Sequence, residues 1–161
     1  MKPRAHWHLD GDELKEPLRY PECGLDDVYL LNGYERYETP YGRGVAVKRL
    51  DQLRDAIGLH LAARKKALTG KEIRFLRKQM DLTQSELARL FGVDAQTVAR
   101  WEKEETTIAG PAELLLRVVF LERACGEVKV HDLLQKLDET DAEMTDRKVF
   151  ESTDEGWRPA A

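Results

Sequence analysis

The segment from Leu82 to Glu102, LTQSELARLFGVDAQTVARWE, limits the possible folds of this chain more than any other. It predicts two short helices joined by a tight turn. Thr83 and Glu86 have the spacing of an N-cap and its capping-box partner, which predicts a helix that runs through Phe91. Gly92 lacks a Cβ and can take the left-handed conformation that ends a helix. The chain therefore turns sharply here.

A second helix is predicted from Ala95 to about Lys103, with Asp94 as its N-cap. The apolar residues of both helices recur at helical spacing, so we expect the two helices to pack face to face. These residues are Leu87, Leu90 and Phe91 in the first helix and Val98 and Trp101 in the second.

Three polar residues of the second helix, Gln96, Thr97 and Arg100, are then left pointing outward. Gln and Arg are the side chains that can form bidentate hydrogen bonds with adenine and guanine edges in a DNA major groove. Pairs of capped amphipathic helices also occur in bundles that never touch DNA. The agreement of caps, turn and exposed Gln and Arg favours the interpretation as a DNA-reading helix-turn-helix.

The segment resembles the lambda-repressor-like, or XRE, helix-turn-helix family. Residues 73–80 and 112–120 supply outer helices of that five-helix bundle. The matching positions are Leu82, Thr83, Gln84, Glu86, Leu87, Ala88, Gly92, Val93, Val98, Trp101 and Glu102.

The resemblance implies roles for individual residues. Gln84 corresponds to the residue that holds the phosphate backbone, and base edges are read from the start of the following helix. The chain departs from the family where a Gly is usual, because Trp101-Glu102-Lys103 runs into Glu104-Glu105. Two carboxylates facing a duplex would repel it. The residues expected to bind DNA are Thr83, Gln84, Ala95, Gln96, Thr97, Arg100 and Lys103.

The charge balance does not indicate DNA binding through bulk attraction. The net charge is −4, and residues 71–123 carry nine basic and nine acidic side chains. Affinity must then depend on where the cations lie, and two copies binding together would double the contacts. We therefore expect a homodimer on an inverted-repeat operator of double-stranded DNA. The cations concerned are Arg74, Arg77, Lys78, Arg89, Arg100 and Lys103.

The rest of the chain predicts a mainly α fold with a small β-containing module. Residues 1–19 are expected to form a flexible arm, 20–70 a small α+β module, 71–124 the helix-turn-helix domain, and 125–161 a last helix and an acidic tail, disordered beyond Thr140. Within the module, Asn32-Gly33 and residues 39–42 are turn signals between short antiparallel strands. Helices are predicted over 50–66, 71–80, from Pro111 to residue 124, and over 130–141.

The N-terminal module resembles the MqsA-type antitoxins, in which two Cys-x-x-Cys pairs hold one zinc ion and the module grips the toxin. Here Tyr20 stands at the first position of the pair, and only Cys23 remains. A tetrahedral site needs four ligands, and His6, His8 and His60 are remote candidates. We therefore expect a degenerate zinc module that binds no metal and no cofactor. Its core is expected to contain Tyr29, Leu31, Tyr34 and Tyr37.

Together these patterns predict a DNA-binding transcriptional regulator, most plausibly an antitoxin that represses its own operon and binds a toxin protein. The alternatives are a stand-alone regulator and a protein-interaction scaffold. We find no catalytic constellation and expect no enzymatic activity. The chain has no long apolar run, and its two isolated cysteines fit a reducing compartment, so a cytoplasmic protein without membrane contact is expected.

Overall fold

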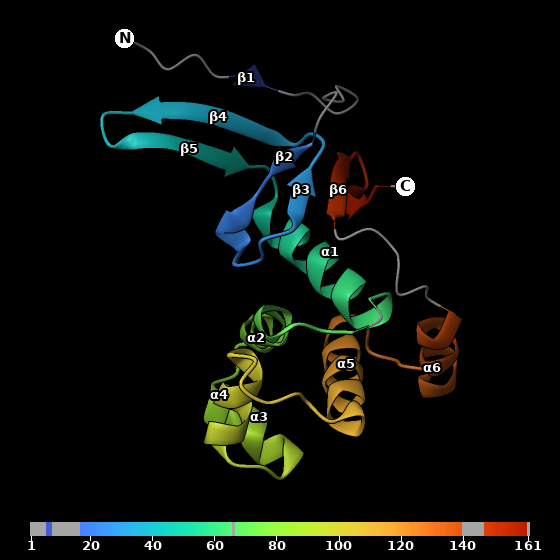
Figure 1. The fold of residues 1–161 in the computed structure, drawn as a ribbon. Helices are drawn as coiled ribbons and strands as arrows, with labels where there is room; N and C mark the ends of the chain where they lie inside the picture. The colour runs from blue at the N-terminus through green and yellow to red at the C-terminus, as the bar shows by residue number, and fades with distance from the viewer. Residues whose placement is uncertain (1–5, 8–16, 66, 140–146, 161) are drawn as a thin grey trace. The chain divides into compact units, whose positions relative to one another are not determined.

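A computed structural model of the chain describes residues 6–7, 17–65, 67–139 and 147–160 (Figure 1). The chain divides into two compact units. The first combines the residues up to Ala56 with the segment from Thr145 onward, and the second comprises Ile57–Met144. The helix-turn-helix unit is therefore inserted, in sequence, between two parts of a discontinuous β-rich unit.

A three-stranded antiparallel sheet in the first unit contains β1 (His6–Trp7), β4 (Tyr34–Thr39) and β5 (Gly42–Val47), in the order β1-β4-β5. Figure 1 shows β4 and β5 running side by side as a long hairpin. The turn at residues 39–42 closes it, because the Thr39 hydroxyl donates to the Gly42 carbonyl at 2.9 Å. This part of the predicted antiparallel arrangement is confirmed. The bend at Asn32-Gly33 instead connects strands of two different sheets.

The second sheet of this unit contains the C-terminal segment, which we had expected to be disordered. Its order is β2-β3-β6-β7, and β3 pairs with β6 in parallel. The disorder expected beyond Thr140 is wrong for residues 147–160. The composition is polar, but alternate residues of β6 are buried, and Asp154-Glu155-Gly156 turns the chain into β7. The strands are β2 (Leu18–Arg19), β3 (Val28–Leu30), β6 (Lys148–Thr153) and β7 (Gly156–Pro159).

The buried polar residues of β6 all have partners in the same unit. Lys148 forms an ion pair with Asp27. The Ser152 N–H donates to Oδ1 of Asn32 at 2.6 Å, and Nδ2 of Asn32 donates back to the Ser152 carbonyl at 3.3 Å. Unpartnered polar groups would be costly in this core, so these contacts favour the observed register.

The apolar core of the first unit differs from the predicted one. Tyr34 is fully buried, as expected, but Tyr29 and Leu31 are only half-buried and Tyr37 is 38% exposed. The alternation of β3 places its other two side chains inward, so the expected strand face was the wrong one. The buried apolar residues include Tyr20, Leu25, Val28, Leu30, Phe150 and Trp157.

The described residues contain six α-helices, and the predicted mainly α fold class is confirmed. α1 contributes to both units, and it ends at Ala63 rather than near Lys66. None of the described helices is long and apolar enough to cross a membrane. In chain order the helices are α1 (Leu50–Ala63), α2 (Gly70–Gln79), α3 (Gln84–Phe91), α4 (Ala95–Glu102), α5 (Gly110–Cys125) and α6 (Val130–Glu139).

Within the second unit, buried Arg117 joins α5 to the end of α1. Its Nη1 donates to the carbonyls of Leu61 and Ala62 at 2.8 and 3.2 Å, and its Nη2 pairs with Glu113 at 2.7 Å. The Phe120 ring also packs closely on Gly58, where an added Cβ would lie 2.4 Å from the ring. A side chain at residue 58 would therefore push α1 and α5 apart.

Candidate nucleic-acid interface

The predicted helix-turn-helix is formed by α3 and α4, and its caps have the expected geometry. The Thr83 side chain accepts from the Glu86 N–H, while the Glu86 carboxylate accepts from the Thr83 N–H at 2.7 Å. Gly92 ends α3 in the left-handed conformation, with φ of 67°. Asp94 caps α4 by accepting from the Thr97 N–H at 2.7 Å. These local interactions hold the turn between the helices.

The contact face between α3 and α4 agrees with the prediction except at one position. Leu87, Val98 and Trp101 are buried, and Phe91 is half-buried. Leu90, expected on the same face, is 59% exposed. Helical spacing alone predicted Leu90 on the apolar face, but the buried face of α3 is narrower than the set of apolar residues in its sequence.

A buried ion pair, which sequence reasoning missed, joins α2 to α4. Nε of Arg77 donates to Glu102 at 2.5 Å, and its Nη2 donates to the second carboxylate oxygen at 3.1 Å. Its Nη1 donates to the Leu82 carbonyl at 2.8 Å. The side chains of Arg77 and Glu102 are only 9% and 5% exposed. We had included Arg77 among the cations expected to contact DNA, but its guanidinium is bound to Glu102 and to the Leu82 carbonyl inside the unit.

Gln84, the expected phosphate anchor, belongs to the same network. Its Nε2 donates to Glu102 at 2.8 Å, and the residue is half-buried at the first position of α3. The Glu102 carboxylate thus orients side chains from both α2 and α3. Such support restricts the rotamers of a side chain before any ligand arrives.

The residues expected to read bases lie on α4. Gln96 and Arg100 are exposed and four residues apart, so they share one helix face. Ala95 is half-buried, and Lys103 is exposed at the end of the helix. The half-buried Thr97 uses its hydroxyl to donate to Asp94 at 2.8 Å.

The acidic loop after α4 ends that helix, and both Glu104 and Glu105 are exposed. Glu104 has φ of 59°, its N–H donates to the Trp101 carbonyl, and the Glu105 N–H donates to the Arg100 carbonyl. This is a Schellman helix end in which Glu104 stands where Gly is usual, at a cost of about 1–2 kcal/mol. The Glu104 carboxylate accepts from the Gly70 N–H at 3.0 Å. This contact supports the start of α2, while the repulsion of phosphate by Glu104 and Glu105 stays a prediction.

Two carboxylates of the motif are held in the charged form by hydrogen bonds. The Thr97 side chain and backbone lower the pKa of Asp94 below its ordinary 3.8. The Thr83 backbone N–H lowers the pKa of Glu86 below its ordinary 4.5. Both caps therefore stay ionised under neutral conditions, where they also complement the positive N-terminal ends of the helices.

Cys23 has the surroundings of a structural thiol. Its Sγ donates to the Tyr20 carbonyl at 3.3 Å, and burial raises its pKa above the usual 9.0. Metal binding requires the thiolate, which this environment disfavours. Within the described residues, no group of three or more His, Cys, Asp or Glu side chains could hold a metal ion. The candidate ligands His6 and His8 lie outside the residues whose side chains are described.

The comparison with known families agrees with this geometry. A family model described as Helix-turn-helix matches residues 73–115, which run from α2 into α5. No curated protein and no solved structure matches the chain. The match covers less than half of the chain, and it supports a DNA-binding helix-turn-helix of the lambda-repressor-like fold in this region. The match does not include residues 20–70, the expected N-terminal module.

Proposed function

We propose that the chain is a sequence-specific regulator that inserts α4 into the major groove of its operator. The observation that carries the proposal is the exposed pair Gln96 and Arg100 on one face of a helix whose ends are capped and whose last residue, Glu102, is fixed by Arg77. Gln and Arg read adenine and guanine edges. Gln84 and Lys103 contact the flanking phosphates, and Thr83 and the half-buried Ala95 and Thr97 lie against the DNA beside them.

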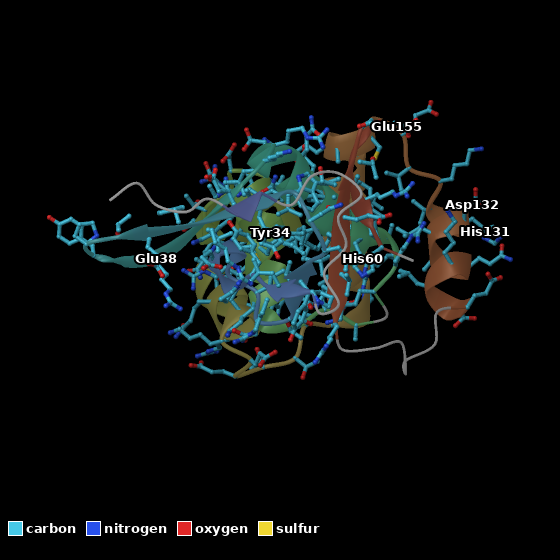
Figure 2. The ribbon with its side chains drawn as sticks, turned by 90° about the horizontal axis from the view of Figure 1, so that it is seen from above. Tyr34, Glu38, His60, His131, Asp132 and Glu155 are labelled. Atoms are coloured by element: carbon cyan, nitrogen blue, oxygen red, sulfur yellow. The ribbon has the colours of Figure 1, made fainter. Side chains whose placement is uncertain are left out.

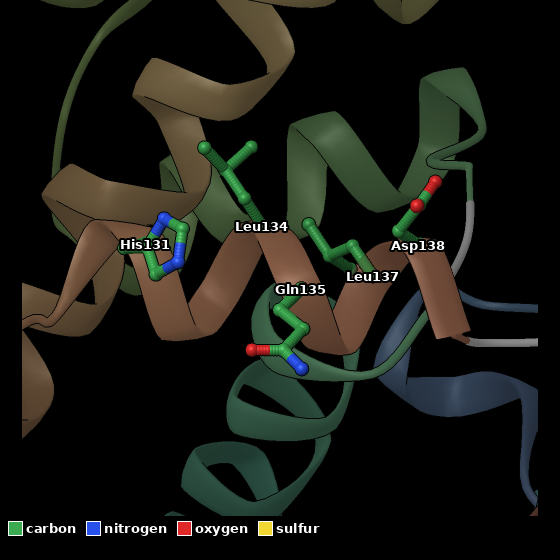
Figure 3. Close-up of a pocket in the computed structure, with 5 residues that line it drawn as sticks. All are labelled: His131, Leu134, Gln135, Leu137 and Asp138. Atoms are coloured by element: carbon green, nitrogen blue, oxygen red, sulfur yellow. The ribbon is translucent and has the colours of Figure 1, made fainter.

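The second part of the proposal is that two copies bind one operator as a homodimer. A single unit with as many acidic as basic residues has few cations for phosphates, so a second copy supplies contacts that one copy lacks. Exposed apolar side chains on α5 and α6, namely Leu115, Val130 and Leu134, support a self-association surface here. Figure 3 shows Leu134 and Leu137 on α6 beside polar His131 and Gln135, along a shallow pocket.

Sedimentation tests the homodimer. We expect wild-type protein to sediment as a dimer, at least on DNA, and the variant Leu115→Ser/Leu134→Ser to shift toward monomer. The exposed Leu90→Ser on α3 is the matched control, since it changes the same type of residue outside this surface. Monomer alone, both free and on DNA, would rule out the homodimer.

The third part of the proposal is that the chain is an antitoxin whose β-rich unit binds a toxin protein. The MqsA-type resemblance supports this, and so does the β4–β5 hairpin. Tyr41 at its tip is fully exposed and Tyr37 partly so. Figure 2 shows Glu38 out along the hairpin and Tyr34 at its inner end. Exposed aromatic side chains are enriched in protein–protein interfaces.

Co-expression with the product of the neighbouring gene tests the antitoxin role. That product alone should arrest growth, and the full chain should both capture it and restore growth. Tyr37→Ser/Tyr41→Ser should lose capture, whereas Leu90→Ser should retain it. Undiminished capture by the tyrosine variant would reject the hairpin as the binding surface. A harmless neighbour would favour a stand-alone regulator.

A further inference from the structure

The exposed face of α2 carries only basic side chains. Three residues of this helix are exposed, namely Lys71, Arg74 and Lys78, and they follow one another at helical spacing. They cover about 10 Å of helix axis at 1.5 Å per residue. We name these three residues the α2 basic stripe. Within the described residues, Arg74 and Lys78 make no ion pair.

Two buried carboxylates of α2 and α4, Glu72 and Glu102, have their partners inside the unit. Glu72, on the same helix, accepts from the Thr69 N–H at 2.9 Å and pairs with Lys65 at 2.5 Å. Glu102 is bound to Arg77. The exposed Glu104 accepts a hydrogen bond from the Gly70 N–H at the start of α2. Neither of these two carboxylates lies on the exposed face of α2, so this face is locally positive although the unit has equal numbers of acidic and basic residues.

The stripe adjoins the end of the motif where phosphate contact is proposed. Arg77 lies on α2 between Arg74 and Lys78, and it contacts both the Leu82 carbonyl, just before α3, and Glu102. Glu102 in turn binds Gln84 at the first position of α3. Along the helix axis, Lys78 and Arg74 are one and three residues from Arg77, so both lie within about one helical turn of it, although the Arg77 side chain is buried and theirs are exposed.

We propose that the α2 basic stripe binds the phosphate backbone outside the base pairs read by α4, and so lengthens the DNA contact of each copy. This inference rests on the proposed function, because it takes α4 to lie in the major groove. Phosphate contacts of this kind add affinity without sequence information. They also add to the salt dependence, by about 0.9 in the slope of log K against log salt for each contact.

The test measures the salt dependence of binding to a mixed-sequence 40-base-pair duplex by fluorescence anisotropy. The variant Arg74→Gln/Lys78→Gln removes two charges of the stripe. The control Arg123→Gln/Lys129→Gln removes two charges from exposed positions near the junction of α5 and α6. Arg74→Lys/Lys78→Arg preserves the charge of the stripe. Far-UV circular dichroism verifies that all variants are folded.

Loss of two contacts should lower the slope by about 1.8 per bound copy. Between 50 and 200 mM salt, wild type should then lose about tenfold more affinity than the Arg74/Lys78 variant for each bound copy. The control and the charge-preserving variant should keep the wild-type slope. An unchanged slope in the Arg74/Lys78 variant would overturn the inference and leave the proposed function standing. An equally lowered slope in the Arg123/Lys129 control would also overturn the inference alone. Absence of binding by wild type would overturn both.

Discussion

Replacing Glu102 by Gln should destabilise the helix-turn-helix unit strongly, although the two side chains have almost the same shape. In the native protein the Glu102 carboxylate accepts two hydrogen bonds from Arg77 and one from Gln84. The Glu102 side chain is only 5% exposed. Glu102→Gln leaves the Arg77 guanidinium buried without its counter-charge. Breaking a buried ion pair by removing one partner costs about 3–5 kcal/mol.

The magnitude distinguishes this pair from a surface ion pair. Native domains are stable by about 5–15 kcal/mol, so Glu102→Gln should remove a large share of the stability of the unit. Arg158 and Glu151 form an ion pair of similar length, 2.7 Å, but Arg158 is 64% exposed. Pairs of this kind contribute about 0–1 kcal/mol. Glu151→Gln is therefore the matched control.

Urea unfolding followed by far-UV circular dichroism measures the loss, and hydrogen exchange of the α4 amides shows where it occurs. We expect Glu102→Gln to lower the free energy of unfolding and speed α4 exchange, and Arg77→Met/Glu102→Met to recover part of the loss because no buried charge remains unpaired. If Glu102→Gln costs no more than Glu151→Gln, the pair does not hold α2 to α4 and the reasoning is refuted.

Three further predictions concern the β-rich unit and the caps. Phe150→Ala should cost about 3–5 kcal/mol by removing a fully buried ring, and hydrogen exchange should quicken in β3 and β6 while α3 and α4 stay protected; protection of β3 equal to wild type would contradict the pairing. The pKa values of Asp94 and Glu86 are lowered, so these caps stabilise α4 and α3 fully above the ordinary values of 3.8 and 4.5, and the stabilisation is lost as the pH falls through the lowered pKa values. Asp94→Asn/Glu86→Gln should therefore flatten the acidic part of the profile of stability against pH. An unchanged profile would exclude the caps as the source of this pH dependence. Purified protein should contain no stoichiometric zinc, and Cys23→Ser should fold as wild type does; one zinc ion per chain by metal analysis would reject the degenerate-module interpretation.

The helix-turn-helix could be predicted closely because its determinants are local. The capping box and the bond from the Thr97 N–H to Asp94 each join residues only three apart, and Gly92 supplies the turn by itself. Single residues thus fix the boundaries of α3 and α4. Local signals of this kind are present in the sequence whatever surrounds them.

The missed features depend on partners far apart in the sequence. Asn32 and Ser152 are separated by 120 residues, and the sequence around each of them does not predict the parallel pairing of β3 with β6. The alternation of β6 followed by Asp154-Glu155-Gly156 was a usable hairpin signal, but the acidic composition concealed it. Arg77 likewise resembles any surface cation until Glu102, 25 residues away, is placed beside it.

The most direct test of the central claim is selection of bound sequences from a randomised DNA duplex library, with wild-type protein and with Gln96→Ala and Arg100→Ala. Wild type should enrich an inverted repeat whose half-sites lie about one helical turn, or a multiple of it, apart. Each variant should lose about 1–3 kcal/mol on that site and relax the preference at one base position, while binding random DNA as before. Enrichment of no sequence by wild type, or equal weakening of both variants on selected and random DNA, would contradict base reading by α4.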